Sequence, residues 1–273
     1  MIRKRLPILT GLLIVWSFAF AGTALALPLA PPNDTKAGIE SLSIPDDITL
    51  DTTNATTDAD DAAMNPPDCG APATDASVWY SLTGTGSWVA IDVSDSDYSA
   101  GVLVTTGDPN NDFVTCGPGA VAWLAESGVT YSILVIDDQQ DGTGNGGNLK
   151  LKVEEIPPPP EISLTVNPKG VFDAHTGGAV VRGTITCTGD ATDSFIDVSM
   201  RQKTGRLFID GEGFVEGFTC DGASHGWSVD IFPFNGVFKG GKTATVTFAL
   251  ACGDFLCGEG FDESVVSLSS KKK

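Results

Sequence analysis

Short runs in which apolar and polar residues alternate follow one another along most of this chain of 273 residues. The clearest run is KTATVTFALAC, in which Ala244, Val246, Phe248, Leu250 and Cys252 occupy every second position. A spacing of two places side chains on one face of a β-strand, whereas a helix needs a spacing of three to four. Clusters of Gly, Asn, Asp and Pro separate the runs, as turns separate strands. The sequence therefore predicts an all-β fold with little helix.

Four consecutive prolines, Pro157–Pro160, interrupt this pattern near the middle of the chain. Proline cannot donate a hydrogen bond within a sheet, and a run of prolines forms a stiff, extended rod. Alternating runs occur both before and after the prolines. We therefore expect two β-sandwich domains, residues 33–155 and 162–268, joined by a Pro-rich linker at residues 156–161.

The first 26 residues have the pattern of a secretory signal peptide. A basic start, Arg3–Arg5, precedes an apolar run, Leu6–Phe20, and small residues follow at Ala24–Ala26. The alternative is an uncleaved anchor, for which the apolar run is short relative to a bilayer core. We expect cleavage after Ala26 and a mature protein that is secreted, extracellular or periplasmic, with no membrane insertion once the signal is removed.

The chain is strongly acidic, with a formal net charge of −19. The signal peptide holds three basic residues and no acidic ones, so its removal takes the charge to −22. Residues 33–155 carry 21 Asp and Glu against 3 Lys, whereas residues 161–273 carry 14 against 10 Lys and Arg. Such a surface repels phosphate backbones, which argues against a nucleic-acid partner. It favours solubility outside the cell and offers carboxylates to hard cations such as calcium.

The six cysteines are an even number in a chain expected to be exported, which favours disulfides over catalytic thiols. The first half holds two of them, which are expected to pair with each other. In the second half, two flank a four-residue loop and leave the other two as a longer link. The favoured pairs are Cys69–Cys116, Cys187–Cys220 and Cys252–Cys257. A rearranged pairing among the four cysteines of the second half stays open as the alternative.

No catalytic motif stands in the sequence context that its chemistry requires. His175 and His225 are the two histidines, both in the second half, so the first half alone cannot form a Ser-His-Asp or Cys-His pair. Each lies beside glycines in a turn-like segment, which is typical of a solvated loop residue. HExxH does not occur, and GxSxG is matched by Gly222–Gly226 (GASHG), which precedes a strand-like run rather than joining a strand to a helix as a nucleophile elbow does. A glycosidase-like pair of carboxylates stays open in so acidic a chain, although no pair stands out. We expect a protein that is not an enzyme, with no catalytic residues.

One glycine-rich segment has a spacing that suits calcium. In IDDQQDGTGNGGN, Asp141, Thr143 and Asn145 stand at alternating positions before Gly146. Oxygen ligands at such positions can wrap a calcium ion. Lys152 stands where an EF-hand requires glutamate, so the segment is not an EF-hand, and a plain hairpin loop explains it equally well.

Tryptophans offer a different kind of binding, because exposed aromatic rings stack on sugars and anchor protein partners. Trp79 and Trp88 stand in two successive alternating runs, and Trp123 in a third. Most tryptophans in such runs are core residues. We expect at least one of these three to be buried.

The first half carries several motifs in a familiar order: PPNDT, DTTNAT, SVWY, IDVSDSD and GVTYSILV. Through them, residues 33–155 resemble the bacterial pre-peptidase C-terminal domain. The resemblance implies a jelly-roll-like β-sandwich, found on secreted peptidases and other exported proteins as a non-catalytic module. This chain departs from the family pattern because no peptidase domain precedes the module.

The same resemblance implies a calcium site and a function. Some relatives, including clostridial collagen-binding domains, bind calcium near their N-terminal linker and then grip a substrate protein. The corresponding residues here are Asn33 and Asp34, completed by Asp58, Asp60 or Asp61. The implied function is that of a secreted, non-catalytic protein whose first domain binds extracellular protein or polysaccharide, with calcium as the cofactor. The alternative is an accessory or inhibitory partner of a separate secreted peptidase.

The second half has a characteristic cysteine spacing and the turn CDGASHGW. Through these features, residues 161–268 resemble an uncharacterised secreted actinobacterial domain with an immunoglobulin-like fold. The resemblance supports the pairs Cys187–Cys220 and Cys252–Cys257, and it makes His225 and Trp227 elements of the fold. It implies no activity.

Overall fold

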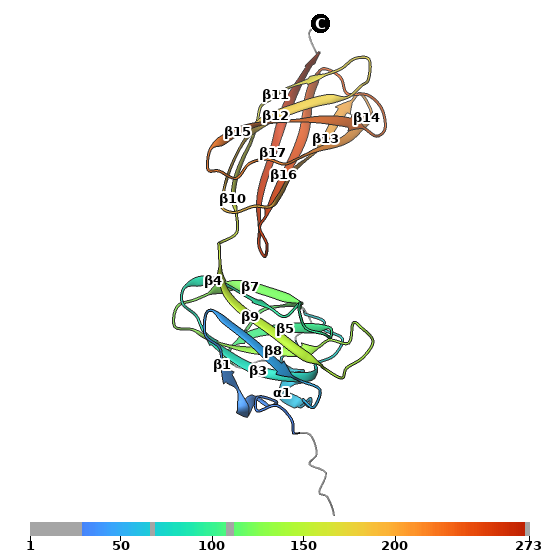
Figure 1. The fold of residues 1–273 in the computed structure, drawn as a ribbon. Helices are drawn as coiled ribbons and strands as arrows, with labels where there is room; N and C mark the ends of the chain where they lie inside the picture. Colours follow the sequence, from blue (N-terminus) through green and yellow to red (C-terminus); the bar gives the residue numbers. More distant parts are fainter. Residues whose placement is uncertain (1–28, 66–68, 108–111, 271–273) are drawn as a thin grey trace, which may run out of the picture.

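The computed structural model describes residues 29–65, 69–107 and 112–270, which form two bodies joined end to end (Figure 1). The expected signal peptide, residues 1–26, lies outside the described residues. Nearly every element is a strand, which confirms the all-β prediction. The described residues contain no helix that is both long enough and apolar enough to cross a membrane.

The described residues of the first half form nine strands, a 3₁₀ turn and one short helix. Its elements are η1 (Lys36–Gly38), β1 (Glu40–Ser41), β2 (Asp46–Asp51), α1 (Ala59–Ala63), β3 (Asp75–Thr83), β4 (Ser87–Asp92), β5 (Ala100–Thr106), β6 (Phe113–Pro118), β7 (Ala120–Ala125), β8 (Thr130–Asp137) and β9 (Asn148–Ile156). They form one sheet in the order β1-β3-β8-β5-β6 and a second in the order β2-β9-β4-β7. The two sheets enclose a core that includes Tyr80, Ile91, Trp123 and Leu151.

Because neighbouring side chains on a strand point to opposite faces, Trp79 leaves this core and lies on the outer side of β3. There it is fully buried with Met64, Leu103 and Leu134. Trp79 and Trp123 are both buried, so the expectation for the tryptophans is confirmed.

The second half, as far as Ser270, forms eight strands. They are β10 (Glu161–Val166), β11 (Lys169–Phe172), β12 (Ala179–Thr188), β13 (Asp193–Thr204), β14 (Leu207–Glu216), β15 (Ser224–Pro233), β16 (Gly241–Cys252) and β17 (Cys257–Ser270). They form a single sheet in the order β10-β12-β11-β17-β16-β13-β14-β15, and β12 also pairs with β15. This extra pairing, which runs from Ala179–Ile231 to Thr186–Ser224, closes the sheet upon itself.

The long pairings of the second half divide its strands into two groups, β10-β12-β15 and β11-β17-β16-β13-β14, which is consistent with the expected sandwich. Pairings of two residues each, between β11 and β12 and between β14 and β15, join the two groups along their edges. Trp227, Phe238, Met200 and Val266 lie among the buried residues that fill the closed sheet.

Strand β16 buries its small side chains and turns its larger apolar side chains outward, which is the reverse of the usual arrangement. Thr243, Thr245, Thr247, Ala249 and Ala251 are buried. The apolar set that makes the alternation so clear in the sequence faces outward instead, with Val246 exposed and Phe248 half-buried. Large side chains from other strands already fill the interior, so β16 contributes small ones. An apolar surface is left on the outside.

Three disulfides link the strands and loops, and they are the pairs favoured by the sequence: Cys69–Cys116, Cys187–Cys220 and Cys252–Cys257. Cys252 and Cys257 are direct partners at the end of the β16–β17 hairpin. All six cysteines are therefore paired.

Candidate functional site

The aspartates expected to bind calcium lie at the start of α1 and take part in a helix cap. The Asp58 carboxylate accepts hydrogen bonds from the backbone N–H groups of Asp60 and Asp61, at 2.8 and 3.2 Å. The buried Asp61 carboxylate accepts from the Asp58 backbone at 2.6 Å and from the Trp79 indole at 2.7 Å. Burial raises the pKa of Asp61 above its ordinary value. This arrangement is a capping box that also satisfies a buried indole.

Asn33 and Asp34 fasten the N-terminal segment to the same region. The buried Asn33 side chain donates to the backbone carbonyl of Trp79 at 3.2 Å. The Asp34 carboxylate accepts from the backbone and hydroxyl of Thr56, at 2.5 and 2.8 Å. The five expected ligands are thus brought to one region, where three carboxylates accept from N–H and O–H groups, namely those of Asp34, Asp58 and Asp61. The Asn33 amide instead donates to a carbonyl, and Asp60 joins the cap through its backbone N–H. The described residues contain no group of three or more His, Cys, Asp or Glu side chains placed to hold a metal. Calcium binding stays a prediction.

The other motifs singled out in the sequence close local turns. Asp141 accepts from the backbone and hydroxyl of Thr143, at 2.8 and 2.9 Å, and these bonds lower its pKa. His225, at the start of β15, lies 2.8 Å from the carboxylate of Asp221, which stands four residues earlier in the segment before the strand. His175 is exposed, and its backbone N–H donates to Asp173.

The most extensive feature that could bind another molecule is the outer surface of four adjacent strands, β14, β13, β16 and β17. Asp197 on β13 has Phe214 on β14 as its direct partner on one side and Phe248 on β16 on the other. Phe248 in turn is paired with Phe261 on β17. These four residues form one row across the sheet, which spans about 14 Å at the usual strand spacing. We call this row, together with Phe195, the phenylalanine face.

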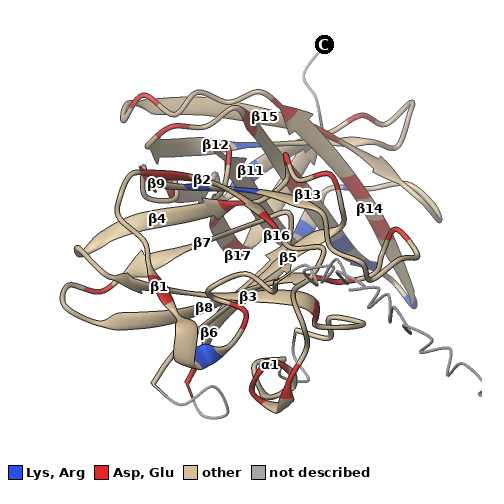
Figure 2. Ribbon diagram, turned by 60° about the horizontal axis from the view of Figure 1, so that its bottom comes forward, with Lys and Arg blue, Asp and Glu red and all other residues tan. Residues whose placement is uncertain are grey.

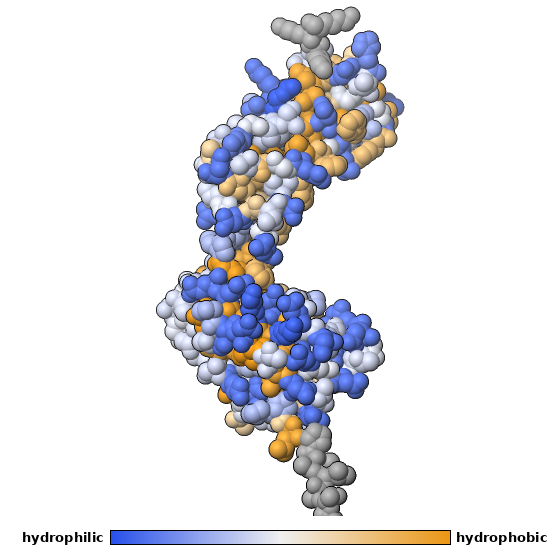
Figure 3. All heavy atoms as spheres, in the orientation of Figure 1, coloured by the Kyte–Doolittle hydropathy of each residue, from blue (hydrophilic) through white to orange (hydrophobic). Residues whose placement is uncertain are grey.

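Two rings of this face are largely exposed, and the other two are half-buried. Phe214 is 66% exposed and Phe261 is 61% exposed. Phe195 and Phe248 lie between them, with ring centroids 6.1 Å apart. Apolar residues colour parts of the second half's surface in Figure 3. Large apolar side chains gathered on neighbouring strands are typical of an interaction site. The alternation in the sequence locates these residues on one face, but does not tell which face is buried.

Acidic residues surround the phenylalanine face. Its two edge strands carry four glutamates, which are cross-strand partners of residues on the inner strands: Glu212, Glu216, Glu259 and Glu263. Asp197 lies in the middle, where burial and the charge of Glu212 raise its pKa. Arg201 is the next outward-facing basic residue along β13, and it is already paired with Asp210 at 2.6 Å. Within the described residues, Asp197 has no ion-pair partner.

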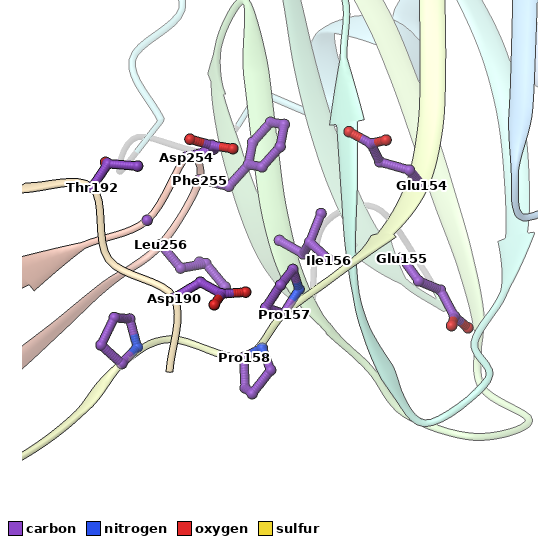
Figure 4. Close-up of a pocket in the computed structure, with 12 residues that line it drawn as sticks. Glu154, Glu155, Ile156, Pro157, Pro158, Asp190, Thr192, Asp254, Phe255 and Leu256 are labelled. Atoms are coloured by element: carbon purple, nitrogen blue, oxygen red, sulfur yellow. The ribbon is translucent and has the colours of Figure 1, made fainter. Parts of the chain in front are cut away.

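A hollow lies at the junction of the two halves (Figure 4). Ile156 and Pro157 line it from the linker side, and Phe255 and Leu256 from the β16–β17 loop. Its volume of about 230 Å³ lies below the roughly 300–1,000 Å³ of typical ligand sites. We therefore describe it as an imperfectly filled contact between the halves.

No family model matches the chain, and no curated protein matches its sequence. Solved structures with some similarity include the ApaA protein from Bordetella pertussis, at 15% identity over 40% of this chain and 95% of that one, with a TM-score of 0.26. They also include Bacteroides uniformis β-glucuronidase 2, at 10% identity over 81% of this chain and 32% of that one, TM-score 0.21. A β-galacturonidase from Eisenbergiella tayi has 12% identity over 82% of this chain and 43% of that one, with a TM-score of 0.24. The chain thus spans less than half of each glycosidase, and similarity at this level carries no argument about function.

Proposed function

We propose that this chain is a secreted, non-catalytic binding protein whose phenylalanine face binds an extracellular protein segment in which basic side chains flank apolar ones. The observation that carries the proposal is the row Phe214–Asp197–Phe248–Phe261. The signal-like N-terminus and the three disulfides support export, because structural disulfides persist outside the cytoplasm. The proposal places binding on the second half, whereas the sequence expectation placed it on the first.

The chemistry of the face favours a protein partner over a sugar. Phenylalanine rings offer apolar contact without a polar group for sugar hydroxyls. A lysine or arginine from the partner could contact the rings of Phe214 and Phe248 and neutralise Asp197 between them. Further cations would face the glutamates of the edge strands. Complementary charge of this kind selects a partner and sets its register.

The test uses two synthetic peptides of about twelve residues. Valine occupies every second position in both, and the positions between are lysine in one peptide and glutamate in the other. We expect the lysine peptide to bind and the glutamate peptide to bind at least tenfold more weakly, as measured by fluorescence anisotropy. Phe214→Ser and Phe261→Ser should each weaken binding of the lysine peptide about tenfold. The equally exposed Phe234 lies in a loop outside this row, so Phe234→Ser is the matched control and should bind normally. Equal binding of both peptides would contradict the proposal.

Asp197 provides a second test, through the pH dependence of stability and of peptide binding. Its pKa is raised in the folded protein, so its ionisation opposes folding, and the resulting penalty is complete at neutral pH. Asp197→Asn should therefore raise the urea midpoint at pH 7 and lose this advantage as the pH falls through the raised pKa of Asp197 to the ordinary aspartate pKa. The same variant should bind the lysine peptide more weakly, and its affinity should fall less on acidification than the affinity of the parent protein. A variant that is less stable at pH 7, or binds the peptide as before, would argue against this role for Asp197.

A further inference from the structure

A second exposed apolar cluster lies at the end of the second half that is remote from the linker (Figure 1). It is formed by the β13–β14 turn and the loop between β15 and β16. Its large apolar side chains are Leu207, Phe208, Phe234 and Val237, which are 68, 51, 64 and 45% exposed. We call these four residues and the cations around them the distal tip. Unlike the phenylalanine face, the distal tip combines a turn and a loop with the strand ends beside them, so its side chains project from the end of the second half.

Basic residues surround these apolar side chains. Of the ten Lys and Arg among the described residues, half belong to the distal tip: Arg201, Lys203, Arg206, Lys239 and Lys242. Arg201 is paired with Asp210 and also lies over the Phe208 ring, 5.6 Å from its centroid. The other four form no ion pair within the part of the chain that the structure describes. In a chain with a net charge of −19, this is a marked local excess of positive charge. Acidic residues are spread along the rest of the ribbon (Figure 2).

Buried and bridging amides hold the two loops in place. The buried Gln202 side chain donates to the Lys239 carbonyl at 2.7 Å and accepts from the Lys239 N–H at 2.9 Å. Asn235 donates to the Phe208 carbonyl at 3.1 Å and accepts from the Asp210 N–H at 2.9 Å. Phe238 is buried between its exposed neighbours and anchors the loop. The apolar side chains are thus presented by a fixed backbone, which reduces the entropy lost on docking.

We infer that the distal tip docks on an anionic lipid membrane surface, with its apolar side chains in the interfacial layer and its lysines and arginines among the lipid headgroups. Apolar side chains combined with lysine and arginine are the combination that binds such interfaces. Each cation near an anionic surface adds to the attraction, whereas the acidic first half would be repelled. A protein partner with an apolar groove would suit the distal tip less well, since it would need acidic walls on several sides at once.

The test measures co-sedimentation of the purified protein with vesicles of phosphatidylcholine alone or with about 30% phosphatidylglycerol. We expect binding to the anionic vesicles, at least tenfold weaker binding to the neutral ones, and weakening as salt is raised. Phe208→Ser combined with Phe234→Ser should reduce binding about tenfold, and so should Lys203→Glu combined with Arg206→Glu. Phe214→Ser combined with Phe261→Ser removes as many exposed rings from the phenylalanine face and should leave vesicle binding unchanged.

A depth measurement keeps the inference testable if a variant is unstable. Phe208→Trp retains an aromatic side chain, and brominated lipids in the anionic vesicles should quench the new tryptophan fluorescence. In the parent protein, the same brominated lipids should not quench the fluorescence of Trp88, which is half-buried in the first half. Absence of binding to anionic vesicles would overturn the inference. The inference would also be overturned if the phenylalanine-face variant lost vesicle binding as much as the distal-tip variants do. Binding to soluble polyglutamate as tight as binding to the anionic vesicles would overturn it too, because the partner would then be an acidic polymer.

Discussion

At the residue scale, the buried contact between Asp61 and Trp79 gives a structural role to an aspartate that the sequence also offers as a metal ligand. The side chain of Asp61 accepts one hydrogen bond from its own helix and one from the indole of β3. The same carboxylate could equally bind a cation. Which use prevails depends on the N–H groups that tertiary packing brings to it. The spacing of aspartates in a sequence does not contain that information, so the candidate ligands could be located but their role could not.

This contact leads to a stability prediction. Asp61→Ala would leave the Trp79 indole N–H and the Asp58 backbone N–H without partners in a buried place. An unsatisfied buried donor costs about 1–3 kcal/mol, so the variant should lose about 2–4 kcal/mol in the free energy of unfolding. Asp60 is the matched control, because its side chain is exposed on the same helix and Asp60→Ala should change stability by less than about 0.5 kcal/mol. Urea denaturation measures both, and equal losses in the two variants would contradict the assigned role.

At the element scale, β16 shows what an alternating pattern of apolar residues can predict and what it cannot. Its period of two predicts a strand, and a strand is found. The pattern does not determine which face is buried, because that depends on how much volume the other strands already fill. Here Trp227, Phe238 and Met200 occupy the interior, and the threonines of β16 fit beside them. The pairing of β12 with β15 likewise could not be predicted from the sequence, because it joins distant segments and no local motif encodes it.

The buried threonines of β16 lead to a second prediction. The Thr247 hydroxyl is fully buried and has no hydrogen-bond partner among the described residues. Thr247→Val keeps the shape and removes the unsatisfied group, so it should raise the free energy of unfolding by about 1 kcal/mol. Thr245 is equally buried, but its hydroxyl donates to the Thr243 carbonyl at 3.5 Å. Thr245→Val should therefore stabilise less. If thermal melting shows the opposite order, the orientation of β16 is wrong.

At the scale of the whole molecule, the short proline linker determines how independent the two halves are. β9 ends at Ile156 and β10 begins at Glu161, so only the four prolines lie between the sheets. Pro160 is buried against the second half, close to Gly258. A stiff spacer of this length limits the range of relative orientations more than a flexible one would.

Replacing Pro157–Pro159 with Gly-Ser-Gly tests this arrangement. We expect the melting of each half to be unchanged, because the prolines contribute no sheet hydrogen bonds. Small-angle scattering should show a broader distribution of interatomic distances, since Gly/Ser linkers behave as flexible coils. Unchanged scattering would show that contacts across the junction, such as those of Phe255 and Leu256, hold the halves together. Phe255→Ser in the same background would then be expected to release them.

The separation of charge along the molecule has a consequence for how it would approach a surface. The first half carries 21 acidic residues against 3 lysines, while unpaired cations gather at the opposite end. Such a chain has a permanent electric dipole directed along its length. In the field of an anionic membrane it would experience a torque that turns the cationic end inward, and salt confines this effect to the last ~10 Å of approach at 0.1 M. The molecule would then stand upright, with its acidic half held away from the lipid and its phenylalanine row accessible from the side.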